Sequence, residues 1–265
     1  MIRFEKVKFS YRTEQRKETS SILEEVSFQI RKGEIVGICG SNGSGKSTTA
    51  LLSAGILIPQ GGDIFVDEIN TRTFNPEIQR KVGLIFQFPE HQIVGITVEE
   101  DLAFGLENLG VERSKMIDRI QFFSQKFGLT EYLKKPVSYL SGGFQQKLAI
   151  ASVLCMEPDF IIFDEPTSQL DPWFQREFWN ILLKIHAEFG LGIIVISQRT
   201  FDLEKTPRLI IIKDKRIAFD GESEKAWQIP EIEDWGVAIP ESVIVRDLRQ
   251  KIEASSICPI RLGNK

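Results

Sequence analysis

The residues best suited to chemistry in this sequence form a glycine-rich stretch, GSNGSGKS, from Gly40 to Ser47, which fits the pattern G-x-x-x-x-G-K-[ST]. Glycines let the backbone fold tightly enough to turn its N–H groups towards anionic oxygens, and the helix that follows presents its positive end. Lys46 would reach the β- and γ-phosphates of a nucleotide, and the Ser47 hydroxyl would ligate Mg²⁺. A glycine turn with an exposed lysine is the alternative, disfavoured because a predicted buried strand and a predicted helix flank the stretch.

Two neighbouring carboxylates form a second candidate for chemistry. The stretch FIIFDE, Phe160 to Glu165, consists of four apolar residues followed by Asp164 and Glu165. On its own this pattern is equally typical of a strand that ends in solvated acids. Together with a phosphate loop it predicts that Asp164 holds Mg²⁺ through water and that Glu165 accepts a proton from, or orients, the attacking water, a role worth about 10²–10⁴ in rate.

A further buried strand ends without such a group. The apolar run from Ile193 to Ile196 is followed by Ser197 and Gln198, although buried strands in nucleotide-hydrolysing folds often end on a catalytic side chain. The residues alone leave two readings open, an ordinary strand end and an active site that lacks one of its parts.

The hydrophobic pattern predicts the elements that hold these groups. Antiparallel strands are expected over residues 2–11 and 24–30, and further strands over 33–39, 62–68, 81–87, 159–165 and 192–197. Also expected are a helix from Gly45 to just before Pro59, an all-helical insert from Val98 to Met156, a closing hairpin turned at Asp214 and Lys215, and a helix that begins at Pro240. This alternation of strands and helices predicts the α/β class.

Composition narrows the range of functions. The 265 residues are 42% hydrophobic and 26% charged, with a formal net charge of -4, which argues against the broad basic surface that non-specific nucleic-acid binding requires. The start, MIRFEKVKFSY, lacks the apolar core of a signal peptide, and no apolar run approaches the roughly 18 residues that span a bilayer. We therefore expect a soluble, cytosolic protein whose three cysteines, Cys39, Cys155 and Cys258, are reduced and mostly buried.

The segment YLSGGFQQKLAIA, from Tyr139, links the two candidate sites to a family. A serine and two glycines that open a helix can be only a helix cap. Taken in order with GSNGSGKS, the glutamine of LIFQFPEHQ, FIIFDEPTSQLD and the later VIS strand, the segment resembles the ATP-binding-cassette (ABC) ATPases, from Ile2 to about Gly221. P-loop kinases and GTPases lack the LSGG helix.

The resemblance implies a domain organisation. It implies a P-loop NTPase fold of the ABC type over residues 1–225, with an antiparallel β subdomain and a helical subdomain at about 95–157 that carries the LSGG signature motif. Residues 226–265 would form a small helical C-terminal extension. In related proteins such an extension helps dimerisation, although the match from Trp227 onward is looser.

The resemblance also implies roles for individual residues. Two cassettes pair head to tail in this family, so Ser141, Gly142 and Gly143, with Gln145, would act in trans on ATP bound to the partner, and Asp171 would cross the dimer interface. Gln87 would contact Mg²⁺ and the attacking water and couple the site to a membrane partner. The residues implied to bind ATP are Tyr11, Gly40, Ser41, Asn42, Gly43, Ser44, Gly45, Lys46, Ser47, Thr48 and Gln87, and those implied to hold Mg²⁺ are Ser47, Gln87 and Asp164. Tyr11 would lie under the adenine, unless it is a strand aromatic packed on the core.

The segment FQFPEHQIVGITVEEDLAFGLENLG resembles a narrower group, the ATPase subunits of energy-coupling factor transporters, which import vitamins and transition-metal ions. In that group a proline-acid-x-Gln stretch follows the loop glutamine, and a V-x-x-D-x-A-F-G-x-x-N helix follows it. The matching residues here are Pro89, Glu90, Gln92, Val98, Asp101, Ala103, Phe104, Gly105 and Asn108, while His91 replaces the usual second acid.

In the ABC family the strand after the Asp-Glu pair normally ends in a switch histidine that contacts the γ-phosphate, and Gln198 occupies that position. The two histidines of the chain are poor substitutes, since we expect His91 in the loop that faces the membrane partner and His186 on a helix surface. A glutamine amide donates a hydrogen bond but cannot become cationic or carry a proton. We therefore expect nucleotide binding to persist and hydrolysis at this chain's own phosphate loop to be weaker.

Two arrangements accommodate Gln198. In the first, the chain pairs with a non-identical cassette, completes that partner's site with its LSGG segment, and keeps its own site mainly for binding. Energy-coupling factor transporters commonly use two different ATPase subunits, which favours this arrangement. In the second, Gln198 supports hydrolysis with Glu165 as the base and both sites work, and the retained Glu165 favours this one.

The leading hypothesis is therefore an ATPase, with ATP and Mg²⁺ as cofactors, that drives a membrane importer from the cytoplasmic face of the cell membrane. Its expected partners are a second cassette, an integral membrane coupling (T) component and a substrate-binding (S) component, with no nucleic acid. A soluble cassette protein acting on nucleic acid or ribosomes is the alternative, but such proteins usually carry coiled-coil inserts or two cassettes. A P-loop small-molecule kinase leaves the LSGG helix unexplained.

Overall fold

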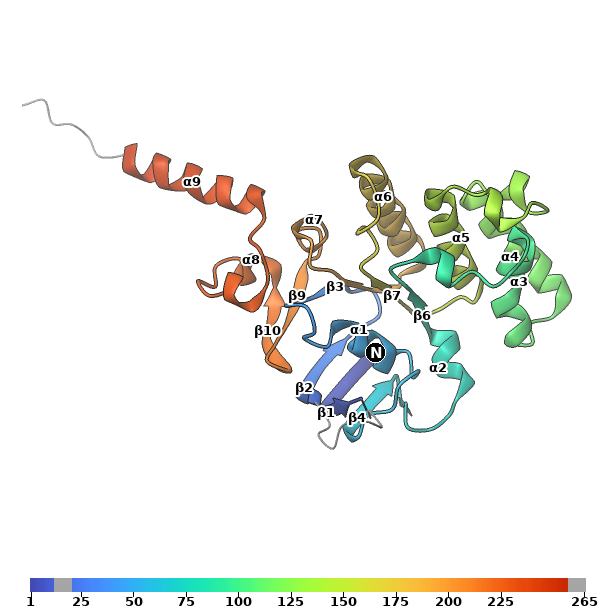
Figure 1. Cartoon of the computed structure of the whole chain (residues 1–265), viewed down its shortest axis with the longest axis horizontal. Helices are drawn as coiled ribbons and strands as arrows, with labels where there is room; N and C mark the ends of the chain where they lie inside the picture. Colours follow the sequence, from blue (N-terminus) through green and yellow to red (C-terminus); the bar gives the residue numbers. More distant parts are fainter. Residues whose placement is uncertain (12–20, 257–265) are drawn as a thin grey trace, which may run out of the picture.

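The computed structural model describes residues 1–11 and 21–256, so most of the predicted loop between the first two strands, and Cys258, lie outside the described residues. Within the described ranges the strands form two sheets (Figure 1). One has the order β2-β1-β4-β5 and the other the order β10-β9-β3-β8-β7-β6. The predicted α/β class is confirmed.

The smaller sheet is antiparallel, as predicted. It consists of β1 (Ile2–Ser10), β2 (Ser21–Ile30), β4 (Gly61–Val66) and the short β5 (Ile69–Asn70), which the sequence analysis did not predict. Alternate residues of β1 and β2 are buried on one face, because the other face of the sheet is exposed to solvent.

The larger sheet is parallel except at one edge. Its parallel strands are β3 (Ile35–Cys39), β6 (Val82–Ile85), β7 (Phe160–Asp164), β8 (Gly192–Ile196) and β9 (Arg208–Lys213), and β10 (Arg216–Glu222) is antiparallel to β9. The hairpin turns at Asp214 and Lys215, as predicted, and both have positive φ, 48° and 68°, the geometry of a type I′ turn.

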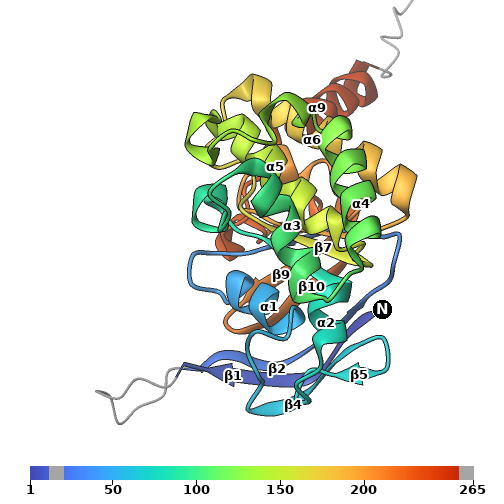
Figure 2. The same ribbon diagram turned by 90° about the vertical axis from the view of Figure 1, so that its right-hand side faces the viewer.

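Two hydrophobic layers cover the larger sheet, which explains its nearly continuous apolar strands. On one face, Ile161 and Phe163 contact a core built with α3 (Val98–Asn108), α4 (Arg113–Lys126), α5 (Gly142–Cys155) and α6 (Pro172–Phe189). On the other face, Phe160 and Ile162 share a core with α1 (Lys46–Ser53) and the antiparallel sheet. Figure 2 shows the antiparallel sheet below α1 and the helical region on the opposite side.

The helix after the phosphate loop is shorter than predicted. It ends at Ser53 instead of continuing to Pro59, because Gly55 adopts a left-handed conformation with φ of 69°. The Ile56 N–H donates to the Leu51 carbonyl at 2.9 Å and the Gly55 N–H to the Leu52 carbonyl at 3.1 Å, the pair of bonds that defines a Schellman cap.

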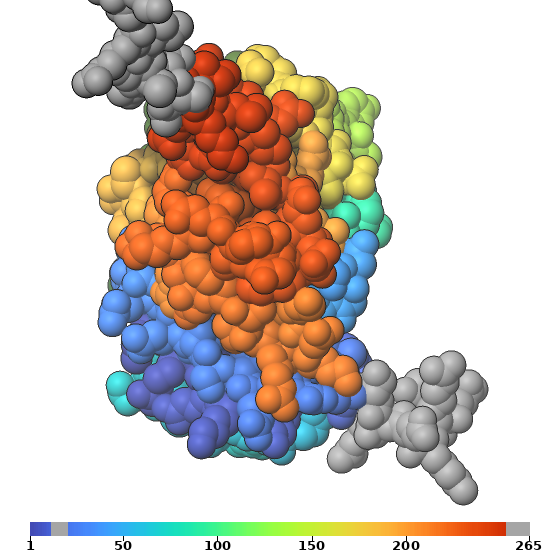
Figure 3. All heavy atoms as spheres, turned by 90° about the vertical axis from the view of Figure 1, so that its left-hand side faces the viewer, coloured from blue at the N-terminus to red at the C-terminus, as the bar shows by residue number. Residues whose placement is uncertain are grey.

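The chain after β10 contributes a third core. After α8 (Ser223–Ala226), the side chains of Trp227, Ile232 and Val237 are buried with Leu209 and Ile211 of β9. Figure 3 shows this face, on which the residues from β9 onward, orange to red, form one continuous surface above the N-terminal strands in blue. This region is therefore anchored to the larger sheet.

The last described helix, α9 (Glu241–Ser256), extends away from the body of the molecule and starts directly after Pro240, as predicted (Figure 1). Its apolar residues Ile244, Val245 and Leu248 are exposed. Within residues 1–11 and 21–256, no helix combines the length and the apolar character needed to cross a membrane.

The described cysteines behave as predicted. Cys39 and Cys155 are buried free thiols. Burial raises the pKa of each thiol to about 12, so neither is a reactive nucleophile near neutral pH.

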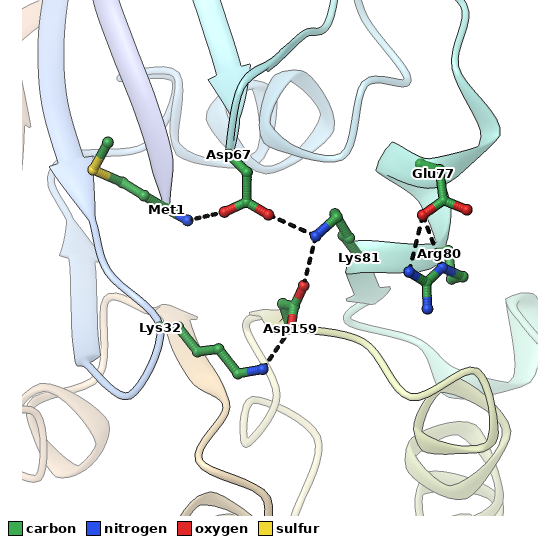
Figure 4. A network of polar contacts seen from close by, with 7 residues as sticks. All are labelled: Met1, Lys32, Asp67, Glu77, Arg80, Lys81 and Asp159. Atoms are coloured by element: carbon green, nitrogen blue, oxygen red, sulfur yellow. Dashed lines mark hydrogen bonds and ion pairs between the residues drawn. The ribbon is translucent and has the colours of Figure 1, made fainter.

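A network of ion pairs joins the two sheets at the ends opposite the phosphate loop (Figure 4). Lys81, the last residue of α2 (Pro76–Lys81), donates to Asp67 at 2.6 Å and to Asp159 at 3.0 Å, and Lys32 donates to Asp159 at 2.5 Å. The Met1 amino group pairs with the other oxygen of Asp67. Burial raises the pKa of Asp159, but the hydrogen bonds from Lys32 and Lys81 outweigh it, and the net pKa is below the ordinary value.

We predict that Lys81→Met lowers the free energy of unfolding by about 1 kcal/mol at pH 7, because it removes two partly exposed ion pairs. A carboxyl group whose folded pKa is lowered contributes stability above its unfolded pKa of about 3.9, and this contribution disappears as the pH falls through the folded pKa. The difference between wild type and Lys81→Met in urea denaturation should therefore shrink below about pH 4. Lys134→Met, which breaks the exposed pair with Glu99, serves as the control and should have little effect. If Lys81→Met lowers the free energy of unfolding equally at all pH values, the loss comes from packing of the lysine side chain and not from its ion pairs.

Candidate functional site

The phosphate loop connects β3 to α1 and leaves the first N–H groups of α1 available. Gly45 stands at the N-cap position with φ of 103°, and no side chain caps the helix. The first N–H groups of a helix have no partner within it, so they can bind an anion. Gly40 also has positive φ, and a Cβ there would lie 2.1 Å from the Ile212 carbonyl oxygen, so only glycine fits this close approach of the backbone.

Lys46 lies inside this loop. Its Nζ donates to the carbonyl oxygens of Gly40 at 2.9 Å and Ser41 at 3.0 Å, and its side chain is buried. Burial lowers the pKa of Lys46, while the carboxylates of Glu165 and Asp164 act in the opposite direction. The loop therefore holds a desolvated amino group beside two acids, an arrangement suited to phosphate oxygens.

The loop opens onto a cavity of about 590 Å³. Sequence-predicted residues that line it are Tyr11, Asn42, Gly43, Gly45, Lys46, Ser47, Thr48, Gln87, Glu165 and Gln198. Ile22, Ser168 and Arg199 also line it, and the sequence analysis did not identify them. The fold thus brings the first two strands, the phosphate loop and the segments around Gln87, Glu165 and Gln198 to one cavity of the size of a small-molecule site.

The two predicted acids end β7 and are not equivalent. Asp164 Oδ1 is buried without a hydrogen-bond partner, and burial raises the pKa of this carboxyl more than the Ser47 hydroxyl and Lys46 lower it. Glu165 has a left-handed backbone with φ of 50°, a strained conformation for a residue with a side chain. Burial also raises its pKa, more than Lys46 and the Gln198 backbone lower it.

Gln87 and Gln198 are held by different partners around the cavity. Gln87 Nε2 donates to Ser168 Oγ at 3.2 Å, and Ser168 Oγ donates to the Glu165 carbonyl oxygen at 2.8 Å. Gln198 Nε2 donates to Asn42 Oδ1 at 2.5 Å, so this amide contacts the phosphate loop itself.

Neither histidine lines the cavity. His91 is exposed with its ring 5.3 Å from that of Phe88, and His186 is half-buried with Nδ1 2.9 Å from the Leu191 carbonyl oxygen. Among the described residues, Gln198 is therefore the group at the expected switch position.

The LSGG segment lies elsewhere. Ser141 and Gly142 are exposed at the start of α5, which has no side-chain cap, and no residue from 141 to 145 lines the described cavity. A Cβ on Gly142 would meet open space, whereas one on Gly143 would lie 2.6 Å from the Phe174 ring. The first N–H groups of α5 have no partner within the helix and no side-chain cap, and they lie outside the cavity of this chain's own phosphate loop.

Two predicted residues have structural roles that sequence reasoning did not give them. Asp171 caps α6, accepting hydrogen bonds from the N–H groups of Trp173 at 2.9 Å and Phe174 at 3.0 Å. Tyr11 is 45% exposed and its hydroxyl lies 3.3 Å from Thr48 Oγ1, so it is not a core residue. Both remain available for the interface and adenine roles predicted above.

The segment after Gln87 is held by its own polar residues. Gln92 accepts from the Phe86 N–H at 3.2 Å and donates to the Leu84 carbonyl at 3.1 Å. Asp101 is buried and accepts from the N–H groups of Val94 and Gly95 and from Ser152 Oγ. These side chains therefore fix the loop that carries Gln87.

Residues whose partners are distant in sequence could not be recognised from the sequence. Gln146 Nε2 donates to the Pro166 carbonyl at 2.8 Å, which ties the LSGG helix to the loop after Glu165. Asp202 is fully buried and accepts three side-chain hydrogen bonds. A buried acid just after a strand end leaves no periodic signal, because its partners are far apart in sequence.

The region after β10 touches the phosphate loop. A Cβ on Gly236 would lie 2.8 Å from Ser41 Cα and 2.9 Å from Ser41 N, and Gly236 has φ of 76°. Contacts below 3.0 Å force a shift of the backbone they meet, so glycine is required here for packing as well as for its conformation.

The geometry agrees with similarities to known proteins. Residues 23–168 match the sequence model of the ABC transporter family. The chain is 34% identical over 244 residues to the energy-coupling factor transporter ATP-binding protein EcfA1 of Caldanaerobacter subterraneus subsp. tengcongensis, covering 91% of this chain and 88% of that protein. It is 37% identical over 242 residues to EcfA1 of Enterococcus faecalis, covering 91% of this chain and 86% of that protein.

Solved structures show the same fold. The structure of cbiO1 from Clostridium perfringens, described as part of the ABC transporter complex cbiONQ, has a TM-score of 0.78 and 25% identity and covers 96% of each chain. The ATP-binding cassette MJ0796, in a dimeric post-hydrolysis state with ADP and Pi, has a TM-score of 0.72 and 26% identity and covers 84% of this chain and 99% of that chain.

We predict that Gly236→Ala weakens ATP binding about tenfold, because the new methyl group displaces the Ser41 backbone in the phosphate loop. Gly33→Ala is the matched control, since Gly33 also has positive φ, 80°, but a Cβ there meets no atom within 4 Å. Both variants should lose about 1–2 kcal/mol of unfolding free energy from the left-handed conformation, and Gly236→Ala should lose more because of its contact with Ser41. Equal ATP dissociation constants for the two variants, measured by calorimetry, would show that the Gly236 contact does not reach the nucleotide site.

Proposed function

Since the chain belongs to the ABC transporter family of ATPases, we propose that it is the ATP-driven motor subunit of an energy-coupling factor importer. The observation that carries this proposal is the extent of the similarity. Its energy-coupling factor relatives match 91% of the chain or more, with 86–90% of their own length covered.

The region after β10 supports the narrower assignment. The cbiO1 structure covers 96% of this chain, whereas the MJ0796 cassette covers 84% although 99% of that cassette is matched. The part of this chain that cbiO1 covers and MJ0796 does not is comparable in length to the region after β10. We propose that residues 1–225 form the cassette and that residues 226–265 form an extension of the energy-coupling factor type, in which the exposed face of α9 contributes to pairing with another cassette.

The residues of the cavity fit ATP with Mg²⁺. The N–H groups of the phosphate loop and Lys46 would bind the phosphates, and Tyr11 would lie against the adenine. Mg²⁺ is held in nucleotide sites by one or two protein oxygens together with the phosphates and water. The partnerless Oδ1 of Asp164 and the Ser47 hydroxyl provide such oxygens, and Gln87 would complete the set.

Glu165 is proposed as the general base. Its backbone turn, its contact with the Gln198 N–H and its place in the cavity hold the carboxylate near the phosphates. The LSGG segment of a second cassette would complete the ATP site of this chain. In the same way, the start of α5 in this chain would bind ATP held by the partner.

A hydrophobic groove beside Gln87 supports a membrane partner. A cavity of about 350 Å³ lies between α3 and α5 and is lined by Gln92, Val94, Asp101 and Phe104 among others. Phe104 is 44% exposed, and Val94, which also lines the groove, is 60% exposed. Exposed apolar side chains around a groove are typical of protein interaction sites. We propose that the integral coupling (T) component docks here, at the cytoplasmic face of the membrane, and that a separate S component selects a vitamin or a transition-metal ion.

We further propose that the natural partner cassette is non-identical. Gln198 is bound to Asn42 in the phosphate loop and, unlike histidine, cannot shuttle a proton. A partner with an intact switch residue would supply the efficient site, while this chain would bind ATP and hydrolyse it slowly.

The first experiment measures ATP hydrolysis by the purified chain over a range of protein concentrations, for wild type, Gln198→His and Glu165→Gln. We expect wild type to be a weak ATPase and Gln198→His to raise the rate several-fold, with a dependence on protein concentration and a requirement for Glu165. If wild type hydrolyses ATP briskly and Gln198→His barely changes the rate, the hypothesis of a non-identical partner is wrong and a symmetric homodimer replaces it. An unchanged rate for Glu165→Gln would remove Glu165 from the role of base.

The membrane partner is tested with two matched phenylalanines. We predict that Phe104→Asp abolishes co-purification with an integral membrane protein from the native host, because a charge in the groove opposes apolar docking. Phe122→Asp is the control, since Phe122 is 48% exposed on α4 and lies outside this groove. ATP binding should be unchanged in both variants. Equal loss of the membrane protein with Phe122→Asp, or retention with Phe104→Asp, would place the docking site elsewhere.

A further inference from the structure

A buried carboxylate lies behind the cavity and connects its two catalytic segments. Asp202 belongs to α7 (Thr200–Leu203), the short helix after Gln198, and its exposed fraction is 0%. The cavity does not include it, and neither the phosphate-loop chemistry nor the similarity to other proteins used above assigns it a role.

Three side chains donate to this carboxylate, one from α6 and two from the loops that follow β7 and β8. Oδ2 accepts from Thr167 Oγ1 at 2.6 Å and from Ser197 Oγ at 2.8 Å, and Oδ1 accepts from Trp179 Nε1 at 2.7 Å. The indole N–H is only a donor, and an ionised carboxylate is only an acceptor, so the roles in this last bond are unambiguous. Trp179 belongs to α6 and is buried in the hydrophobic core, so it anchors the carboxylate to this helix.

The donors lie next to the residues proposed for catalysis. Thr167 follows Glu165 by two residues, and the Glu165 N–H donates to the Ile196 carbonyl at 2.8 Å. Ser197 directly precedes Gln198. One buried oxygen atom of Asp202 thus joins the turn that carries Glu165 to the strand end that carries Gln198.

A second set of bonds extends this connection to the rest of the cavity. Arg199 donates from Nη1 to the Thr167 carbonyl at 2.7 Å and from its backbone N–H to Ser197 Oγ at 3.1 Å. Ser168, beside Thr167, accepts from Gln87. Gln87 is therefore connected to the Gln198 strand end by hydrogen bonds through Ser168, Thr167, Asp202 and Ser197, with the peptide bond between Thr167 and Ser168 as one covalent step.

We propose that Asp202 is a positioning residue for ATP hydrolysis, which holds the segments of Glu165 and Gln198 in a fixed relative position through Thr167 and Ser197. It does not touch the nucleotide. A fully buried carboxylate without hydrogen bonds costs much free energy. Loss of any of its three donors is therefore unfavourable, and this keeps the donors in a fixed arrangement. The proposal rests on the roles proposed above for Glu165 and Gln198.

The test uses Thr167→Val, Ser197→Ala and the double variant. Thr167→Val keeps the volume of a fully buried side chain and removes only the hydroxyl that reaches Asp202. Thr206→Val is the matched control, because the Thr206 hydroxyl is equally buried but donates to the Leu203 carbonyl instead of Asp202. Hydrolysis is followed in single turnovers with enzyme in excess over ATP, so that slow rates are measurable.

We expect Thr167→Val and Ser197→Ala each to lower the maximal single-turnover rate about tenfold, with the enzyme concentration for half-maximal rate changed less than twofold. The double variant should lose little more than either single one, because both substitutions interrupt the same link. Thr206→Val should lower thermal stability by a similar amount and leave the rate near that of wild type.

Hydrogen exchange supplies a readout that does not depend on hydrolysis. Ser197→Ala should accelerate exchange of the amides at residues 165–168, and Thr167→Val should accelerate exchange at 197–199, although neither substitution lies in the segment measured. Thr206→Val should accelerate neither. Exchange that rises only within the substituted segment would overturn the proposal.

The kinetic outcomes separate this inference from the proposed function. Equal rate losses for Thr167→Val and Thr206→Val, or rate losses that add in the double variant, would overturn the role of Asp202. If Glu165→Gln abolishes hydrolysis while Thr167→Val does not lower it, Asp202 is not a positioning residue and the proposed function stands. If Glu165→Gln leaves hydrolysis intact, the proposed catalytic roles fail, and the reciprocal exchange still decides whether Asp202 connects the two segments.

Discussion

The register of three parallel strands is the constraint on which the rest of the site depends. Ile38 of β3 lies opposite Ile196 of β8, and Ile196 lies opposite Asp164 of β7, so the loops that follow these strands begin at one level of the sheet. The carboxyl ends of parallel strands share an edge, and ligands bind there. Apolar layers on both faces maintain this register, since a slip of one residue would turn each strand's side chains to the opposite layer.

At that edge a buried lysine lies near two carboxyl groups whose pKa values are raised by burial. Lys46 is desolvated and satisfied by two backbone carbonyls, while burial raises the pKa of Asp164 and Glu165. A nucleotide phosphate with Mg²⁺ would offer Lys46 an anionic partner and Asp164 a cationic one. The start of α5, which also lacks a cap, points elsewhere, and this separation is the structural basis for proposing that two chains share each site.

Two regions that do not line the cavity are connected to it by contact. The segment after β10 presses Gly236 against Ser41 of the phosphate loop, and Asp202 joins the Glu165 turn to the Gln198 strand end. The groove that follows Gln87 in the chain is lined by Gln92 and Asp101, whose hydrogen bonds hold that segment.

The sequence by itself determined the strands other than the short β5, the phosphate loop, the Asp164-Glu165 pair, the hairpin turn and the start of α9, because each depends on local patterns such as apolar runs, glycines and proline. It did not determine the end of α1, where a Schellman cap at Gly55 stopped the helix before Pro59. Nor did it indicate Gly236 against Ser41 or the donors of Asp202. Only the tertiary structure decided these, because Thr167 and Asp202, or Ser41 and Gly236, are brought together by packing of the whole sheet and have no regular spacing along the chain.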